Sequence, residues 1–139
     1  MKTLFIVHLS PVFEANFRDS YVLDIILEAN KDIYDRVVFL DADGVDAGAY
    51  VFLKDWKEHV EWNWGDAPPD CHAESERKWV VEVSNGFVPV PEILRDTTQD
   101  TWGEIYVVGG ANGECLQGFL DILSHLNLNY DVINHLTYG

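Results

Sequence analysis

Short unbroken runs of apolar residues alternate with helix-patterned segments along this chain, and this alternation most strongly limits the folds open to it. An apolar run of four to eight residues is typical of a buried strand in a parallel sheet. Such runs predict five strands, at residues 3–8 (TLFIVH), 36–41 (RVVFLD), 78–83 (KWVVEV), 104–108 (EIYVV) and 129–136 (NYDVINHL). Apolar residues at helical spacing predict helices within residues 15–30, 50–60 and 115–126.

Strands that alternate with helices predict a three-layer α/β/α fold with a mainly parallel sheet of about five strands. The chain has 139 residues, of which 47% are hydrophobic, so residues 1–139 are expected to form a single domain with a real core. The Trp-rich residues 61–76 show no clear period and are expected to form an irregular loop. Residues 84–96 contain two prolines, which predicts a loop that leads to a short helix at most.

Charge and composition exclude several classes of partner. The net charge is −15, with 24 acidic against 9 basic residues, so the phosphates of a nucleic acid would be repelled. The first apolar run is broken by His8 and no run approaches membrane-spanning length, which argues against a signal peptide and a membrane protein. Two cysteines allow at most one disulfide, as expected of a reduced cytoplasmic protein. The histidine spacing matches no zinc signature, and we expect neither a metal nor a cofactor.

Right-handed crossovers place the carboxyl ends of parallel strands on one edge of the sheet, where ligands bind in such folds. The predicted strands deliver to this edge His8, Asp41, Glu82 or Val83, the turn at 109–115, and the region of Asn134 and His135.

Cys115 stands in the first turn of its predicted helix, where unpaired N–H groups and the helix dipole stabilise a thiolate. The glycines before it permit a tight turn that exposes backbone N–H groups, which could hold an oxyanion. Strands one and four are often neighbours at the ligand crevice, so His8 could act as a base for Cys115. Glu82 or Asp41 could then orient the imidazole. Alternatively, Cys115 belongs to the apolar stripe of its helix, and His8 is a satisfied histidine at a strand end.

The segment VVGGANGEC at 107–115, followed by a helix and LNLNYDVI, resembles the signature of the isochorismatase-like cysteine hydrolases. That family includes nicotinamidases and related amidases. The resemblance implies that Cys115 is the nucleophile and that backbone N–H groups at Ala111 and Cys115 form an oxyanion hole. The resemblance aligns the family's glycine with Gly109, its alanine with Ala111 and its usual threonine with Asn112, and Gly110 belongs to the same turn.

Two catalytic positions of that family hold other residues here. The family's aspartate at the end of the first strand falls on His8, and its lysine falls on or beside Val83, next to Glu82. Either the chain is a degenerate relative that no longer hydrolyses the usual substrates, or His8 replaces the aspartate as the base, with Glu82 or Asp41 to orient its imidazole.

Trp62 and Trp64 lie two residues apart and share a face if this segment is extended. They are expected to form either a lid over the crevice or an oligomer contact. The contact would fit the resemblance, because members of that family usually assemble as oligomers.

The sequence thus leaves two functions open. The first is a divergent isochorismatase-like cysteine hydrolase that cleaves an amide or similar C–N bond of a small molecule through Cys115. The alternative is a non-catalytic acidic binding protein that retains the scaffold and recognises a protein partner.

Overall fold

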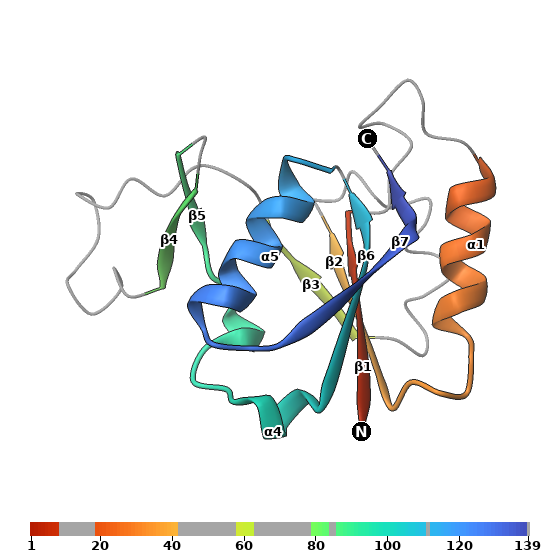
Figure 1. Cartoon of the computed structure of the whole chain (residues 1–139), viewed down its shortest axis with the longest axis horizontal. Helices are drawn as coiled ribbons and strands as arrows, with labels where there is room; N and C mark the ends of the chain where they lie inside the picture. The colour runs from red at the N-terminus through yellow and green to blue at the C-terminus, as the bar shows by residue number, and fades with distance from the viewer. Residues whose placement is uncertain (9–18, 42–57, 63–78, 84–85, 111, 139) are drawn as a thin grey trace.

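The computed structural model describes residues 1–8, 19–41, 58–62, 79–83, 86–110 and 112–138. Five parallel strands form the main sheet in the spatial order β3-β2-β1-β6-β7 (Figure 1). Their bounds are β1 Lys2–Val7, β2 Arg36–Asp41, β3 Glu58–Glu61, β6 Glu104–Gly110 and β7 Tyr130–Tyr138. The predicted α/β class and mainly parallel five-stranded sheet are confirmed.

Helices lie on both faces of this sheet (Figure 1). Successive side chains of a strand point to opposite faces, so β1 contributes to two separate cores. Phe5 packs toward α5 (Cys115–His125), with its ring centroid 5.2 Å from that of Phe119. Its neighbour Ile6 packs on the other face, in the core that contains Ile25 of α1 (Asp19–Ala29). Complete burial of each such side chain contributes about 1.5–3 kcal/mol.

A small antiparallel sheet packs on the face that α5 covers. It consists of β4 (Val80–Val83) and β5 (Gly86–Pro89), and Val81 and Val88 join the α5 core. A short 3₁₀ helix, η3 (Glu92–Leu94), and the single turn of α4 (Gln99–Trp102) lead from β5 to β6.

Three expectations about single elements are wrong. The helix predicted at 50–60 ends in strand β3, while its earlier part, residues 50–57, lies outside the described residues. The strand predicted at 78–83 belongs to the small sheet and not to the main one. The region 84–96, expected to be a loop and a short helix, also contains strand β5.

Helix α5 has nearly the predicted bounds, and a capping motif ends it. Asn127 has a positive φ of 58°, and the Leu128 N–H donates to the Leu123 carbonyl at 2.9 Å. This pattern is a Schellman motif, in which asparagine is one of the residues that tolerate the left-handed conformation. Among the helices that the structure describes, none is both long and apolar enough to cross a membrane.

Candidate functional site

The order in which strands are added to the main sheet reverses between the neighbouring parallel strands β1 and β6. From β1 the chain proceeds outward to β2 and β3, and it later returns to place β6 on the other side of β1. This point is the topological switch point, where open parallel sheets bind ligands beyond the carboxyl ends of their strands. His8 directly follows β1, and the glycines 109 and 110 end β6. The predicted adjacency of the first strand and the 104–108 strand is confirmed.

His8 is held in a left-handed backbone conformation, with a φ of 44°. Its N–H donates to the Leu40 carbonyl at 3.0 Å, and its carbonyl accepts a hydrogen bond from the Tyr138 hydroxyl. Its ring Nε2 lies 2.9 Å from the Trp62 carbonyl oxygen, and the residue is 2% exposed. Such a conformation persists only where the surroundings enforce it, and strained residues of this kind cluster at functional sites.

The glycine pair at the end of β6 permits two close approaches. Gly109 has a φ of 108°, and a Cβ atom there would collide with the Val7 carbonyl oxygen. A Cβ atom at Gly110 would lie 2.8 Å from the Tyr138 ring. Both positions therefore require glycine, one for its backbone conformation and contact with β1, the other for contact with β7.

Tyr138 links the carboxyl ends of three strands. Its ring packs against Gly110 of β6, its hydroxyl reaches the His8 carbonyl after β1, and its own carbonyl accepts the Asn112 N–H at 2.7 Å. The Asn112 side chain also donates to the Thr137 hydroxyl at 3.3 Å. Tyr138 is 4% exposed and is a component of this edge that the sequence did not reveal.

A bulge in β7 explains why Tyr138 was missed. Val107 pairs with Val132, whereas Gly109 pairs with Thr137, so β7 contains extra residues between these two pairs. Asn134 and His135 fall inside this irregular part and are exposed, instead of ending the strand at the sheet edge as expected. The bulge carries the chain on to Tyr138.

Trp62 is buried, so its side chain does not offer the surface that an oligomer contact would need, and its place beside the crevice stays a prediction. It is 2% exposed, its ring lies edge-on to Phe119 with centroids 5.8 Å apart, and its indole N–H donates to the Pro89 carbonyl at 2.8 Å. Its ring also lies beside that of His8, with centroids 5.3 Å apart. Trp64 lies outside the described residues.

Cys115 is the first residue of α5 and is half-buried against the same core as Phe119 and Trp62. Cys115 therefore begins its helix after the glycine turn, as predicted, and it also contacts the apolar core, while its role as a nucleophile stays a prediction. Ala111 lies outside the described residues, so the oxyanion hole implied by the resemblance stays a prediction.

Glu82 does not end a strand of the main sheet, and this prediction was wrong. Its strand β4 pairs with β5 alone in the small sheet, where Glu82 opposes Phe87. The third strand of the main sheet is β3, which ends at Glu61 and is followed by Trp62. Asp41 does end β2 at the carboxyl edge, as predicted, but its side chain and that of Glu82 lie outside the described part of the chain.

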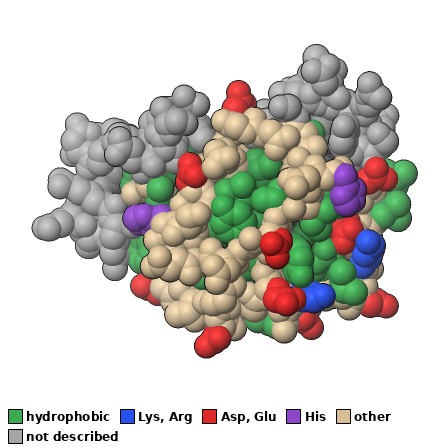
Figure 2. All heavy atoms as spheres, viewed as in Figure 1, with side chains coloured by type: hydrophobic (Ala, Val, Ile, Leu, Met, Phe, Trp, Pro, Cys, Tyr) green, Lys and Arg blue, Asp and Glu red, His purple; other side chains and the backbone are tan. Residues whose placement is uncertain are grey.

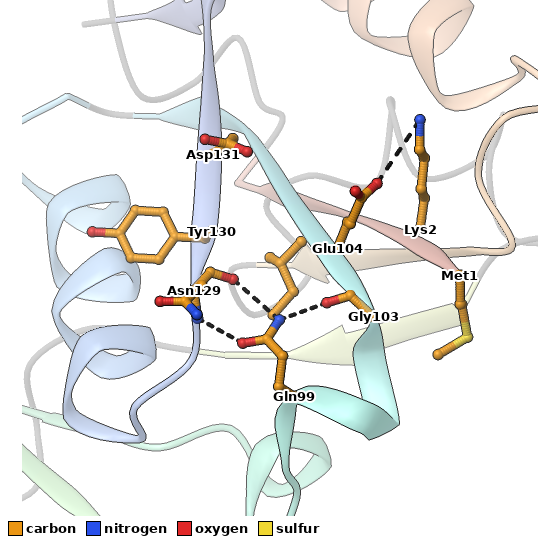
Figure 3. Close-up of a pocket in the computed structure, with 9 residues that line it drawn as sticks. Met1, Lys2, Gln99, Gly103, Glu104, Asn129, Tyr130 and Asp131 are labelled. Carbon is orange, nitrogen blue, oxygen red and sulfur yellow. Dashed lines mark hydrogen bonds and ion pairs between the residues drawn. The ribbon is translucent and has the colours of Figure 1, made fainter.

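A hollow of about 640 Å³ lies at the opposite, amino edge of the sheet (Figure 3). Its central side chain is Gln99, whose carboxamide accepts the Asn129 N–H at 2.7 Å and donates to the Gly103 and Asn129 carbonyls. These hydrogen bonds join α4 to the start of β7, so we assign Gln99 a structural role and not a ligand-binding one. Lys2 and Glu104 form an ion pair at its rim, with 3.9 Å between the charged atoms.

One titratable cluster lies on the α1 side of the sheet. The Glu28 carboxylate accepts hydrogen bonds from the Tyr34 hydroxyl at 2.6 Å and from Lys31 Nζ at 2.9 Å. Burial raises the pKa of Glu28, but these two hydrogen bonds and the charges of Lys31 and His135 outweigh it, so the pKa lies below its ordinary value. Burial and the bond to Glu28 raise the pKa of Tyr34. Among the described residues, no group of three or more His, Cys, Asp or Glu could hold a metal ion.

Acidic side chains are scattered over the face seen in Figure 2 and do not gather in one patch there. Comparisons of the chain with models of protein families, with curated proteins and with solved structures find no match.

Proposed function

We propose that the protein is a divergent isochorismatase-like cysteine hydrolase, with its crevice at the carboxyl ends of β1 and β6. In this proposal Cys115 is the nucleophile, His8 is the base, and the substrate is a small molecule with an amide or similar C–N bond. The observation that supports it best is the buried, left-handed His8 at the switch point, held there by three hydrogen bonds. A structural histidine gains little from a conformation that destabilises the backbone by about 1–2 kcal/mol.

The proposed reaction uses a thiolate. The Cys115 thiol passes its proton to the His8 imidazole, and the thiolate adds to the carbonyl carbon of the amide. The C–N bond then breaks as the imidazolium returns the proton to the departing amine. Water hydrolyses the remaining thioester, which releases the acid and restores the thiol. Backbone N–H groups at Ala111 and Cys115 would stabilise the oxyanion.

Alkylation of Cys115 by iodoacetamide between pH 5 and 9 tests this proposal, with peptide mass spectrometry and Cys71 as the internal control. A rate that is already high at pH 6 indicates a stabilised thiolate and supports the proposal. An ordinary cysteine has a pKa of about 8.5. A rate that rises only as the pH approaches this value contradicts the proposal.

Hydrolysis of a panel of small primary amides gives a second test. Release of ammonia by the wild-type protein, and its loss in Cys115→Ala, is the expected result. Equal release by the two proteins would assign the hydrolysis to another site or to a contaminant.

One observation favours the alternative, a binding protein for a basic partner. Leu23 and Leu27 stand one turn apart on α1 and are 57% and 58% exposed. Exposed leucines beside acidic residues on a chain of net charge −15 suit a basic amphipathic helix. Calorimetric titration with a synthetic helix of lysine and leucine tests this alternative. Binding that is lost in the Leu23→Ser, Leu27→Ser double variant would support it, and equal heats for both proteins would exclude α1 as the binding surface.

A further inference from the structure

The hydrogen bond between His8 and Trp62 determines which ring nitrogen of His8 carries a hydrogen. His8 Nε2 lies 2.9 Å from the Trp62 main-chain carbonyl oxygen. A carbonyl oxygen can only accept a hydrogen bond, so Nε2 must be the donor. In a neutral imidazole, the lone pair that can take up a proton then belongs to Nδ1.

Trp62 is itself fixed in place by contacts with two other elements. Its indole N–H donates to the Pro89 carbonyl of β5 at 2.8 Å, and its ring lies edge-on to Phe119 of α5. The main chain of His8 is fixed independently, by its bonds with Leu40 and Tyr138. A rotation of the imidazole by half a turn would break the bond to the Trp62 carbonyl. The surroundings therefore select one ring orientation.

We propose that Trp62 is a positioning residue, which holds His8 as the Nε2–H tautomer and makes Nδ1 the atom that receives the Cys115 proton. Nδ1 is buried, so the proton acceptor faces the protein interior and not bulk water. The proton moves from Cys115 Sγ to Nδ1 and leaves a thiolate beside an imidazolium. The Nε2–H bond to Trp62 becomes charge-assisted in that state, which strengthens it. The role of Nδ1 toward Cys115 rests on the proposed function, whereas the tautomer does not.

Long-range proton–nitrogen correlation spectra of protein labelled with ¹⁵N-histidine at pH 7 test the tautomer. His8→Gln identifies the His8 signals by their disappearance. A neutral ring with a protonated Nε2 is the expected result. A protonated Nδ1, or a doubly protonated ring, would overturn the assignment.

Two variants test the positioning role of Trp62 in the same spectra. Trp62→Phe keeps the main-chain carbonyl but removes the hydrogen bond to Pro89, and should give a mixture of the two tautomers. Trp79→Phe, at a half-buried tryptophan of the neighbouring hairpin, should leave the His8 signals unchanged. An unaltered tautomer in a folded Trp62→Phe protein would show that Trp62 does not position the ring.

His8→Gln tests the proton-accepting role of Nδ1. The glutamine amide can still donate to the Trp62 carbonyl, but it cannot take up a proton at neutral pH. The alkylation rate of Cys115 at pH 7 should fall by about tenfold or more. An unchanged rate would overturn the proton transfer and with it the proposed function. Because the spectra test the tautomer separately, a failure of the proposed function can be distinguished from a failure of the tautomer assignment.

Discussion

Tyr138 donates its hydroxyl hydrogen to the main-chain carbonyl of His8, across the carboxyl end of β6. The two residues are separated by 130 positions in the sequence, and both are buried. The bond ties the edge strand β7 to the conformation of the residue that follows β1. The orientation of this carbonyl is set by the left-handed backbone conformation of His8. The hydrogen bond from the Tyr138 hydroxyl therefore stabilises that conformation, on which the candidate site depends.

Replacement of Tyr138 by phenylalanine should therefore destabilise the protein. The His8 carbonyl would lose its donor inside the protein, and we expect the free energy of unfolding to fall by about 1–3 kcal/mol. Urea denaturation followed by tryptophan fluorescence measures this change. Tyr130→Phe is the matched control, because the Tyr130 hydroxyl lies 3.5 Å from Ser124 Oγ in an exposed contact. Equal losses in both variants would show that the bond to His8 contributes nothing particular.

The two glycines of the turn with positive φ should respond very differently to alanine. In Gly109→Ala the new Cβ atom meets the Val7 carbonyl and the φ of 108° is also strained. We expect a loss of about 3 kcal/mol or more in the free energy of unfolding. Gly113 has a φ of 75° but open space around its Cβ position, so Gly113→Ala should lower stability by only about 1 kcal/mol.

Urea denaturation of both alanine variants separates strain from collision. If Gly113→Ala destabilises the protein as much as Gly109→Ala, the close approach of β6 to β1 is not the reason for glycine at 109.

The interior of the fold could be predicted from the sequence because its elements have strong local patterns. The continuous apolar runs of β1, β2 and β6 indicate strands that are buried on both faces of the sheet. The apolar stripe of α5 indicates a helix that packs along one face. β3 was missed because its sequence, EHVE, is polar and belongs to a sheet edge. β5 was missed because it contains Pro89, a residue that strands tolerate at sheet edges.

The candidate site was predictable only where it follows from the rule for parallel sheets. That rule places His8 and the glycine turn on neighbouring strands, which the structure bears out. The rule could not predict the position of Glu82, because the sequence of an apolar strand does not indicate which sheet the strand joins. Tyr138 depends on the bulge in β7, and the three-residue shift in pairing has no clear signal in the sequence.

Arg36 should prove to be an anchor for the edge strand β3. Its guanidinium donates to both carboxylate oxygens of Glu58, at 2.8 and 2.7 Å, and lies 4.3 Å from the centre of the Trp102 ring. Arg36→Lys keeps the charge but loses the paired hydrogen bonds, so we expect stability to fall by about 1 kcal/mol. The measurement is urea denaturation at low and high salt. Lys2→Met, which removes the 3.9 Å ion pair with Glu104, is the control and should change stability by less than about 0.5 kcal/mol.

Glu28 should make the stability of the protein depend on pH in the acid range. Its pKa in the folded protein lies below the ordinary value of 4.5. A carboxylate with a lowered folded pKa stabilises the fold above its unfolded pKa, and this contribution is lost as the pH falls through the folded value. Glu28→Gln should therefore be less stable than the wild type by about 1–2 kcal/mol at pH 7.

The difference in unfolding free energy between the wild type and Glu28→Gln should shrink as the pH is lowered from 4.5 toward 3. Urea denaturation of both proteins at each pH gives this difference and removes the contribution of the other acidic residues. Asp32→Asn, at an exposed position after α1, is the matched control, measured at the same pH values. A difference for Glu28→Gln that is independent of pH would mean that the bonds to Tyr34 and Lys31 do not favour the charged carboxylate.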